Sequence, residues 1–326
     1  MQVKNQKIVV LGTGGTIAGE SESSSEGLSY KAAQRGIDVL LRSVSDVGQG
    51  MPEVLANIEF IAEQVAQIDS KDMDFAIWRH LAQRCSVWLA QEDVLAVVIT
   101  HGTDTLEETA YFLSRVVSVN KPIVITCAMR PANFKDADGP QNLRDAMTVA
   151  ASTNGAGVWM VAAGEVHHSQ CVQKVHPTRI NAFDSGESGA AAWIKDDQIT
   201  WATAFQPVAS APSFDVNQLP EPAHWPWVEI LLNHVQADPR HVEVLQKAGI
   251  DGLVLAGTGN GSIGNHLKEA LLRAQTAGVE VRIASRCNQG PVIPTSSHAF
   301  QVSDGLNPVK TRVALLLELM SNRQGH

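Results

Sequence analysis

Apolar runs rich in valine and isoleucine alternate, along the first half of the chain, with longer segments in which apolar positions recur at helical spacing. These patterns predict strands over 7–13, 95–100, 121–129 and 157–165, and helices over 74–91, 107–118 and 140–152. Fully apolar strands are typical of a parallel sheet that helices cover on both faces. The pattern therefore predicts a doubly wound, mostly parallel α/β domain.

A proline-rich segment interrupts the alternation. Residues 205–227 hold five of the fourteen prolines, and each proline removes a backbone donor and fixes φ, so we expect an extended linker. The alternation then resumes, with strands expected over 227–234, 251–259 and 279–286 and helices over 239–249, 263–278 and 308–321. The sequence thus predicts a larger N-terminal α/β domain over 1–204, a linker over 205–227 and a smaller C-terminal α/β domain over 228–326.

Composition and charge narrow the choice of partners. The 326 residues carry a formal net charge of −9, and an acidic surface disfavours nucleic acid and anionic lipid. No apolar run approaches the roughly 20 residues of a membrane span, and the N-terminal run is too short for the apolar core of a signal peptide. We therefore expect a cytoplasmic protein that acts on a small molecule and binds neither nucleic acid nor membrane.

Metal binding is not expected. The four cysteines lie far apart, without a C-x-x-C pair and without a His/Cys cluster at the spacing of metal ligands. They are interpreted mainly as buried thiols of a reduced compartment.

The first loop that follows a strand, GTGGTIAGES, resembles a phosphate-binding loop only in its spacing. Glu20 stands where such a loop has lysine, so the loop would repel a triphosphate. Ile17 occupies the place of the third glycine of a dinucleotide fingerprint. What remains is a tight glycine turn that holds Thr16 at a strand end, followed by a polar stretch that ends at Tyr30. Either these two side chains are structural, or they take part in catalysis.

The next strand ends in the loop THGTDT, which leads directly into a helix. Thr105 and Glu108 match a capping box, and Asp104 is interpreted either as an additional helix cap or as a functional group. In the functional interpretation, Thr103 and Asp104 present a hydroxyl and a carboxylate to a ligand that carries an amino group and a reacting carbonyl.

Two uninterrupted signatures now point to a family. The stretch TGGTIAG at 13–19 and the stretch HGTDTLEET at 101–109 resemble those of bacterial-type L-asparaginases, the two-domain asparaginase/glutaminase family. The resemblance continues through AMRPAN, DGPQNL, GTGNG and LNPVKTRVALLL. It implies an amidohydrolase that converts L-asparagine and water to L-aspartate and ammonia with no metal or organic cofactor, and glutamine is a further candidate substrate.

The resemblance also implies roles for individual residues. Thr16 would be the nucleophile, with Tyr30 beside it. Thr103, Asp104 and Lys174 would form a second catalytic group, although Lys174 could equally be a solvated strand lysine. A hydroxyl needs such a neighbouring base to attack an amide.

Further residues are implied to bind the substrate. Ser70 would bind the α-carboxylate and Asp104 the α-ammonium, while Ala128 would offer its backbone carbonyl to the amide nitrogen. Lys71 stands beside the substrate's α-groups, where its charge would favour the carboxylate and crowd the ammonium. Asn260 lies in a turn that, in the family, reaches the site of an adjacent subunit, which implies a homodimer or homotetramer with shared sites.

Two other functions are also compatible with parts of the sequence. Gly259–Gly264 reads G-x-G-x-x-G between an expected strand and helix, and Arg286 ends the next strand, as in an NADP-dependent oxidoreductase. This alternative explains neither signature. A non-catalytic amino-acid sensor would need Ser70 and a carboxylate, but it would not need Thr16, Tyr30 and Lys174 together.

Overall fold

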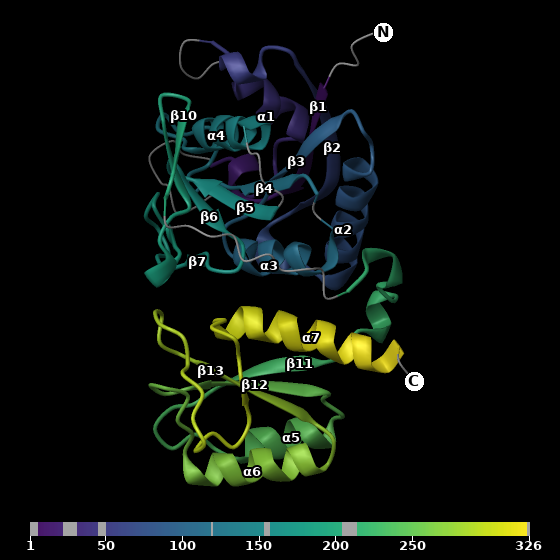
Figure 1. Cartoon of the computed structure of the whole chain (residues 1–326), viewed down its shortest axis with the longest axis vertical. Helices are drawn as coiled ribbons and strands as arrows, with labels where there is room; N and C mark the ends of the chain where they lie inside the picture. The colour runs from purple at the N-terminus through teal and green to yellow at the C-terminus, as the bar shows by residue number, and fades with distance from the viewer. Residues whose placement is uncertain are drawn as a thin grey trace. The chain divides into compact units, whose positions relative to one another are not determined.

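The computed structural model describes residues 6–21, 31–44, 50–118, 120–152, 157–203 and 214–324. The chain divides into two compact units, Met1–Leu219 and Pro220–His326 (Figure 1). Among the described residues, no helix is both long enough and apolar enough to cross a membrane.

Unit 1 is built on an eight-stranded sheet with the spatial order β10-β9-β6-β5-β4-β3-β1-β2. Its strands are β1 (Gln6–Gly14), β2 (Ile58–Ile68), β3 (Val94–Thr100), β4 (Pro122–Thr126), β5 (Gly157–Ala162), β6 (Glu165–His168), β9 (Ala192–Lys195) and β10 (Gln198–Trp201). Strands β2, β1, β3, β4 and β5, which are neighbours in this order across the sheet, run parallel. Strands β6, β9 and β10 are added in antiparallel pairs. A separate two-stranded ribbon pairs β7 (Gln173–Lys174) with β8 (Phe183–Asp184). The predicted mostly parallel α/β fold is confirmed.

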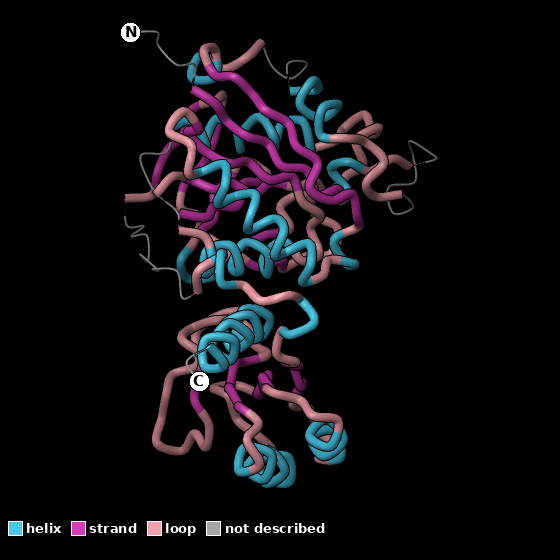
Figure 2. Tube along the Cα trace, turned by 90° about the vertical axis from the view of Figure 1, so that its right-hand side faces the viewer, coloured by secondary structure: helices cyan, strands magenta, loops and turns pink. Residues whose placement is uncertain are grey.

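Helices cover both faces of this sheet, as Figures 1 and 2 show. They are α1 (Ile37–Val44), α2 (Phe75–Leu89), α3 (Leu106–Val116) and α4 (Gly139–Ser152). Helices α1 and α4 pack together on one face, and α2 and α3 pack on the other. The side chains between α4 and the sheet, among them Val98, Val124 and Met147, are fully or almost fully buried.

The sequence patterns missed β2. Its eleven residues, IEFIAEQVAQI, mix polar and apolar side chains, and most of them are only partly buried. The strand forms the edge of the sheet, where one long side of a strand has no neighbour. An edge strand does not need the continuous apolar run that marks the central strands.

The parallel strands of unit 1 end at one edge of the sheet. Gly12 of β1 pairs with Thr100 of β3, which in turn pairs with Thr126 of β4. Gly14 pairs with Ile68, the last residue of β2. The loops after these four strands therefore emerge side by side at the carboxyl edge, where ligands of open α/β sheets bind.

Unit 2 repeats the architecture on a smaller scale. Its parallel sheet has the order β11-β12-β13-β14, with β11 (Val228–Leu232), β12 (Gly252–Gly257), β13 (Glu280–Ser285) and β14 (Gln301–Val302). Helix α7 (Pro308–Gln324) covers one face, and α5 (Arg240–Lys247) and α6 (Asn265–Thr276) cover the other (Figure 1). The predicted second α/β domain is confirmed, while the exact domain boundaries stay predictions.

The described part of the proline-rich segment is not extended throughout. It forms two short 3-10 turns, Val216–Gln218 and Pro222–His224. Residues 204–213 lie outside the described part of the chain.

Candidate active site

Two glycines bring the loops after β1 and β3 into direct contact. A Cβ atom on Gly15 would lie only 2.3 Å from Gly102 Cα and 2.4 Å from Gly102 N. Gly15 also adopts a φ of 79°, which favours glycine. Only two residues without side chains allow this backbone approach. The turn that holds Thr16 therefore lies against the turn that holds Thr103 and Asp104.

Thr16 begins a short 3-10 turn, Thr16–Ala18, directly after β1. Its carbonyl oxygen accepts a hydrogen bond from the N–H of Gly19 at 2.8 Å, and its side chain is 5% exposed. The hydroxyl thus lies at the carboxyl edge of the sheet, as predicted. Tyr30, the residue expected beside it, lies outside the described residues.

Thr103, Asp104 and Lys174 form one hydrogen-bonded group. The Lys174 ammonium donates to Thr103 Oγ1 at 2.8 Å and to Asp104 Oδ1 at 2.6 Å. The Lys174 side chain is only 17% exposed, so it is not the solvated strand lysine of the alternative interpretation. Its backbone N–H donates to Glu107 Oε1 at 3.3 Å, which ties the β7–β8 ribbon to α3.

The predicted capping box is wrong. Thr105 does precede α3, but its side chain makes no capping hydrogen bond. Its hydroxyl donates instead to the carbonyl oxygen of Ser70 at 2.8 Å. The Thr105 hydroxyl, which the local sequence pattern assigned to the helix terminus, therefore binds the loop after β2 instead. Asp104 is not the alternative cap either, because among the described residues its carboxylate accepts hydrogen bonds from Thr103 Oγ1 and Lys174 Nζ and from no helix N–H.

Ser70 is buried against the same turn. Its Oγ accepts a hydrogen bond from the N–H of Asp104 at 3.2 Å, which leaves the hydroxyl proton for a ligand. A Cβ on Gly102 would lie 2.5 Å from this oxygen. The neighbouring Lys71 differs, because its exposed ammonium contacts Asp69 at 2.5 Å. This partner offsets the charge that the sequence suggested would crowd a substrate ammonium.

Ala128 follows β4 and is fully buried. Two residues that the sequence analysis did not single out hold its loop. Asp138 accepts hydrogen bonds from the N–H groups of Met129 and Arg130, each at 2.9 Å, and Asn142 Nδ2 donates to the carbonyl oxygen of Cys127 at 2.9 Å. Among the described residues, no group donates a hydrogen bond to the Ala128 carbonyl. Asp138 and Asn142 both lie in the stretch DGPQNL. The family resemblance of that stretch was the one sequence feature that could have pointed to them.

Burial is the main influence on the pKa of the Asp138 carboxyl group. Its carboxyl lies largely away from water, which raises its pKa above the ordinary range, while the two backbone N–H donors and Asn142 oppose that rise. The carboxyl is thus held by hydrogen bonds rather than by a cation.

Asn260 belongs to unit 2, and there its side chain is already engaged. Its Nδ2 donates to the carbonyl of Ile293 at 2.9 Å, and its Oδ1 accepts the N–H of the same residue at 2.7 Å. The turn Gly259–Gly264 does lie between β12 and α6, as the dinucleotide alternative required. Within unit 2, Asn260 therefore fixes a loop.

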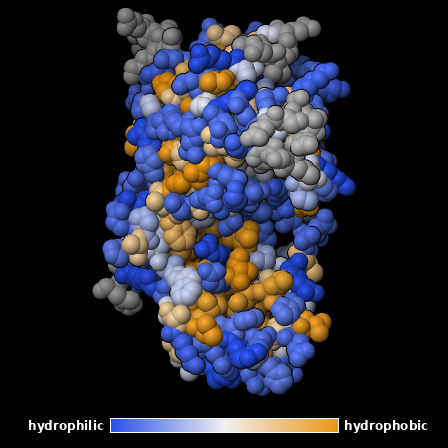
Figure 3. Space-filling model, turned by 180° about the vertical axis from the view of Figure 1, so that it is seen from behind, coloured by the Kyte–Doolittle hydropathy of each residue, from blue (hydrophilic) through white to orange (hydrophobic). Residues whose placement is uncertain are grey.

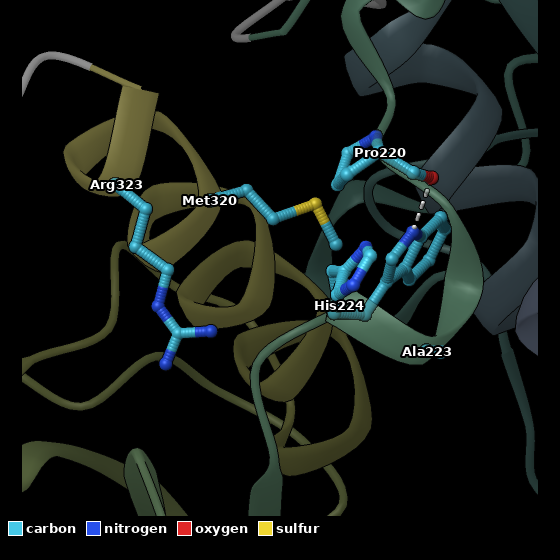
Figure 4. Close-up of a pocket in the computed structure, with 6 residues that line it drawn as sticks. Pro220, Ala223, His224, Met320 and Arg323 are labelled. Atoms are coloured by element: carbon cyan, nitrogen blue, oxygen red, sulfur yellow. Dashed lines mark hydrogen bonds between the residues drawn. The ribbon is translucent and has the colours of Figure 1, made fainter.

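Other hollows lie away from the predicted site residues. In unit 2, a pocket of about 480 Å³ lies between the segment 220–225 and α7. Figure 4 shows the Met320 side chain reaching toward His224, while Arg323 extends along α7. Within the described part of the chain, no group of three or more His, Cys, Asp or Glu residues could hold a metal ion.

Comparison with known proteins identifies relatives along nearly the whole chain. The family model described as "Asparaginase, N-terminal" matches residues 7–206, and the one described as "Glutaminase/Asparaginase C-terminal domain" matches residues 227–325. The chain is 35% identical over 317 residues to L-asparaginase 2 of Bacillus subtilis, covering 96% of this chain and 82% of the relative. It is 36% identical over 324 residues to a probable periplasmic L-asparaginase of Haemophilus influenzae, covering 97% and 89% respectively.

A solved structure has the same fold. The crystal structure of a probable cytoplasmic L-asparaginase from Campylobacter jejuni matches with a TM-score of 0.87 at 34% sequence identity. The match covers 96% of this chain and 95% of that chain.

Proposed function

Because the chain belongs to the asparaginase family, we propose that it hydrolyses the side-chain amide of L-asparagine to give L-aspartate and ammonia. One observation carries the proposal. The turn of Thr16 lies against a turn whose Thr103 and Asp104 share the ammonium group of Lys174. A hydroxyl, a carboxylate and an amine thus meet at the carboxyl edge of one sheet.

Binding is proposed to use the groups left open around that turn. Asp104 is half exposed, with Oδ1 on Lys174, and among the described residues Oδ2 accepts no hydrogen bond. This oxygen would bind the α-ammonium of the substrate. The Ser70 hydroxyl would donate to the α-carboxylate, and the Ala128 carbonyl would accept a hydrogen bond from the amide nitrogen.

The reaction would proceed in two halves. The Thr16 hydroxyl oxygen attacks the side-chain amide carbon, its proton passes to a base, and the carbonyl electrons move to oxygen to form an oxyanion. When the oxyanion collapses, the C–N bond breaks and the nitrogen leaves with a proton as ammonia. Water then attacks the acyl-threonine ester, releases L-aspartate and restores the hydroxyl.

Two bases compete for the first proton in this proposal. One is Tyr30, fourteen positions after Thr16 in the sequence. The other is the pair of Thr103 and Lys174, which are joined by a 2.8 Å hydrogen bond and would accept the proton with the Lys174 side chain as a neutral amine. Backbone N–H groups near Thr103 would stabilise the oxyanion.

We also propose a homodimer or homotetramer with shared sites. Exposed apolar residues support it: Leu232, Val235 and Ile293 are each more than half exposed in unit 2. Leu232 is the last residue of β11 and Val235 lies three positions beyond it, while Ile293 contacts Asn260 in the turn after β12, so all three lie at the carboxyl edge of that sheet. In the view from behind, residues of hydrophobic type gather on the surface of the lower unit (Figure 3). Apolar surface of this kind commonly marks an interface.

The location is proposed to be the cytoplasm. The solved relative from Campylobacter jejuni is called cytoplasmic, whereas the Haemophilus influenzae relative is called periplasmic. Fractionation of the source cells, with activity followed in each compartment, distinguishes the two.

Thr16→Ala tests the proposed function. Without the hydroxyl, ammonia release from L-asparagine should fall by about a thousandfold or more, because removal of a nucleophile removes the covalent route. Thr16→Ser is the matched control, since it keeps a hydroxyl, and it should retain measurable turnover.

The assay should compare L-asparagine, L-glutamine and D-asparagine, because one methylene in a pocket changes binding by only roughly 1–3 kcal/mol. Folding is checked by circular dichroism. Turnover by Thr16→Ala close to that of the unmodified protein would eliminate the nucleophile. Consumption of added NADPH, with no ammonia released, would favour the oxidoreductase alternative.

A further inference from the structure

His101 lies directly under the proposed active-site turn and is completely buried. Its Nδ1 lies 2.7 Å from the carbonyl oxygen of Gly102, and its Nε2 lies 3.0 Å from Thr109 Oγ1. Thr109 also accepts a hydrogen bond from Trp78 Nε1 at 2.9 Å. Both partners are buried as well, so the three side chains form a closed chain of hydrogen bonds.

The hydrogen bonds of this chain can run in one direction only. The Trp78 indole can only donate, so Thr109 Oγ1 accepts from it and keeps its own proton to donate to His101 Nε2. The carbonyl of Gly102 can only accept, so the imidazole proton must be on Nδ1. Burial also lowers the pKa of His101 to about 4, so the ring is neutral near pH 7. The surroundings therefore select one neutral tautomer.

This tautomer fixes the peptide group between Gly102 and Thr103. A trans peptide is planar, so its C=O and its N–H point in opposite directions. Because Nδ1–H of His101 holds the Gly102 oxygen, the N–H of Thr103 points away from the buried ring. Among the described residues this N–H has no acceptor, whereas the next one, of Asp104, is bound by Ser70.

The packing leaves that peptide little freedom to rotate. Gly15 contacts Gly102 on one side, and a Cβ on Gly102 would lie 2.5 Å from Ser70 Oγ. The carbonyl oxygen still needs a buried partner, because an unpaired buried acceptor is costly. The imidazole supplies that partner.

From this geometry we propose that His101 is a positioning residue, which aims the Thr103 N–H at the oxyanion of the proposed hydrolysis. The inference rests on the proposed function. His101 does not act as a base itself, because its ring has no contact with solvent and both nitrogens are occupied by Gly102 and Thr109.

His101→Leu and His101→Asn test the proposal as a pair. Leucine fills much of the volume but cannot donate to the Gly102 carbonyl, whereas the asparagine Nδ2 can donate in place of Nδ1–H. Loss of one oxyanion donor lowers kcat by about 100-fold to 1000-fold. We therefore expect His101→Leu to lower kcat by about tenfold to 1000-fold with KM changed less than about threefold, and His101→Asn to recover part of the loss.

Trp78→Phe is the control variant. The Trp78 ring stacks on Phe112 at a centroid distance of 4.7 Å, and phenylalanine would keep an aromatic ring in that place. The substitution leaves the hydrogen bond between His101 and Gly102 unchanged. Its kcat should stay within about threefold of the unmodified value. If His101→Leu raises KM with kcat unchanged, or leaves both unchanged, the proposed role is wrong.

A nuclear magnetic resonance measurement on the unmodified protein tests the tautomer directly. In ¹⁵N-labelled protein, the His101 ring should show a protonated Nδ1 and an unprotonated Nε2 from about pH 6 to pH 8, with the resonance assigned by its absence from His101→Asn. A protonated Nε2 would overturn the inference even if the enzyme hydrolyses L-asparagine. If the unmodified protein releases no ammonia from any amide tested, the proposed function fails, while the tautomer assignment is judged separately.

Discussion

Asp145, on α4, is a buried carboxyl group that no cation contacts directly among the described residues. The residue is 3% exposed, and burial raises its pKa from 3.8 to about 6. Gln141 Nε2 donates to Oδ1 at 2.7 Å, which opposes the rise. The adjacent Arg144 guanidinium forms two bonds with Asp197, at 2.7 and 2.6 Å. At neutral pH the charge of Asp145 therefore costs stability.

The sign of the pH dependence follows from that raised pKa. The folded protein binds the proton more tightly than the unfolded chain, so the contribution of Asp145 to stability falls as the pH rises from about 4 through about 6. Asp145→Asn removes the charge and keeps an oxygen for Gln141. At pH 8 the variant should raise the free energy of unfolding by up to about 3 kcal/mol, because each unit of pKa shift corresponds to about 1.36 kcal/mol. Near pH 4 it should raise the free energy of unfolding only a little.

Urea denaturation of both proteins at the two pH values measures this difference. A gain from Asp145→Asn that is the same at pH 4 as at pH 8 would contradict the assignment. Activity is expected to be retained, because Asp145 is not among the residues proposed to touch the substrate.

At the scale of elements, the decisive contact is between the ends of β1 and β3. Thr13 Oγ1 donates to the carbonyl of Thr100 at 2.9 Å, so the two strand ends are joined just before their turns. Beyond them, Gly15 and Gly102 touch through their backbones. The distance between the proposed nucleophile and its partners is therefore set by two glycines.

Gly102→Ala tests that contact. The new Cβ would meet Ser70 Oγ at 2.5 Å and Gly15 Cα at 3.1 Å, so the turns must separate. We expect the free energy of unfolding to fall by about 1–3 kcal/mol and kcat/KM to fall by about 100-fold or more, because small displacements of reacting groups are costly.

Gly36→Ala is the matched control, since only Gln64 Oε1, at 4.0 Å, lies near its new Cβ. It should leave both quantities nearly unchanged. Unchanged turnover in Gly102→Ala would show that the close approach of the two turns is not needed for catalysis.

At the scale of the whole molecule, the exposed apolar edge of unit 2 predicts self-association. Val235 is 96% exposed and Ile293 is 65% exposed, and a glutamate at both positions would place charges in the proposed interface. The Val235→Glu, Ile293→Glu variant should lower the mass measured by light scattering toward the 35.0 kDa of one chain.

Activity should fall together with the mass, because the sites are proposed to be shared between copies. Val244→Glu is the control, since Val244 is 64% exposed but lies on α5, away from the strand ends. A multi-subunit mass retained by the double variant, or a single-chain mass for the unmodified protein, would refute the assembly.

The sequence predicted the features that local patterns encode. Central strands such as β1 and β3 must be apolar on both faces, so their runs are visible without a structure. The family resemblance supplied the activity and the roles of Thr16, Thr103 and Asp104, which stay predictions. The edge strand β2 was missed because a half-buried strand carries no such run.

Only the tertiary structure decided which groups meet. Lys174 is 70 positions from Asp104 in the chain, and the ribbon β7–β8 brings them to 2.6 Å. Thr105 was assigned to a helix cap by its neighbours, yet a carbonyl from the loop after β2 takes its proton. The tautomer of His101 follows from the Gly102 carbonyl on one side of the ring and the Thr109 hydroxyl on the other. Hydrogen bonds between distant segments depend on distance and direction in space, whereas a sequence pattern records only hydrophobicity and spacing along the chain.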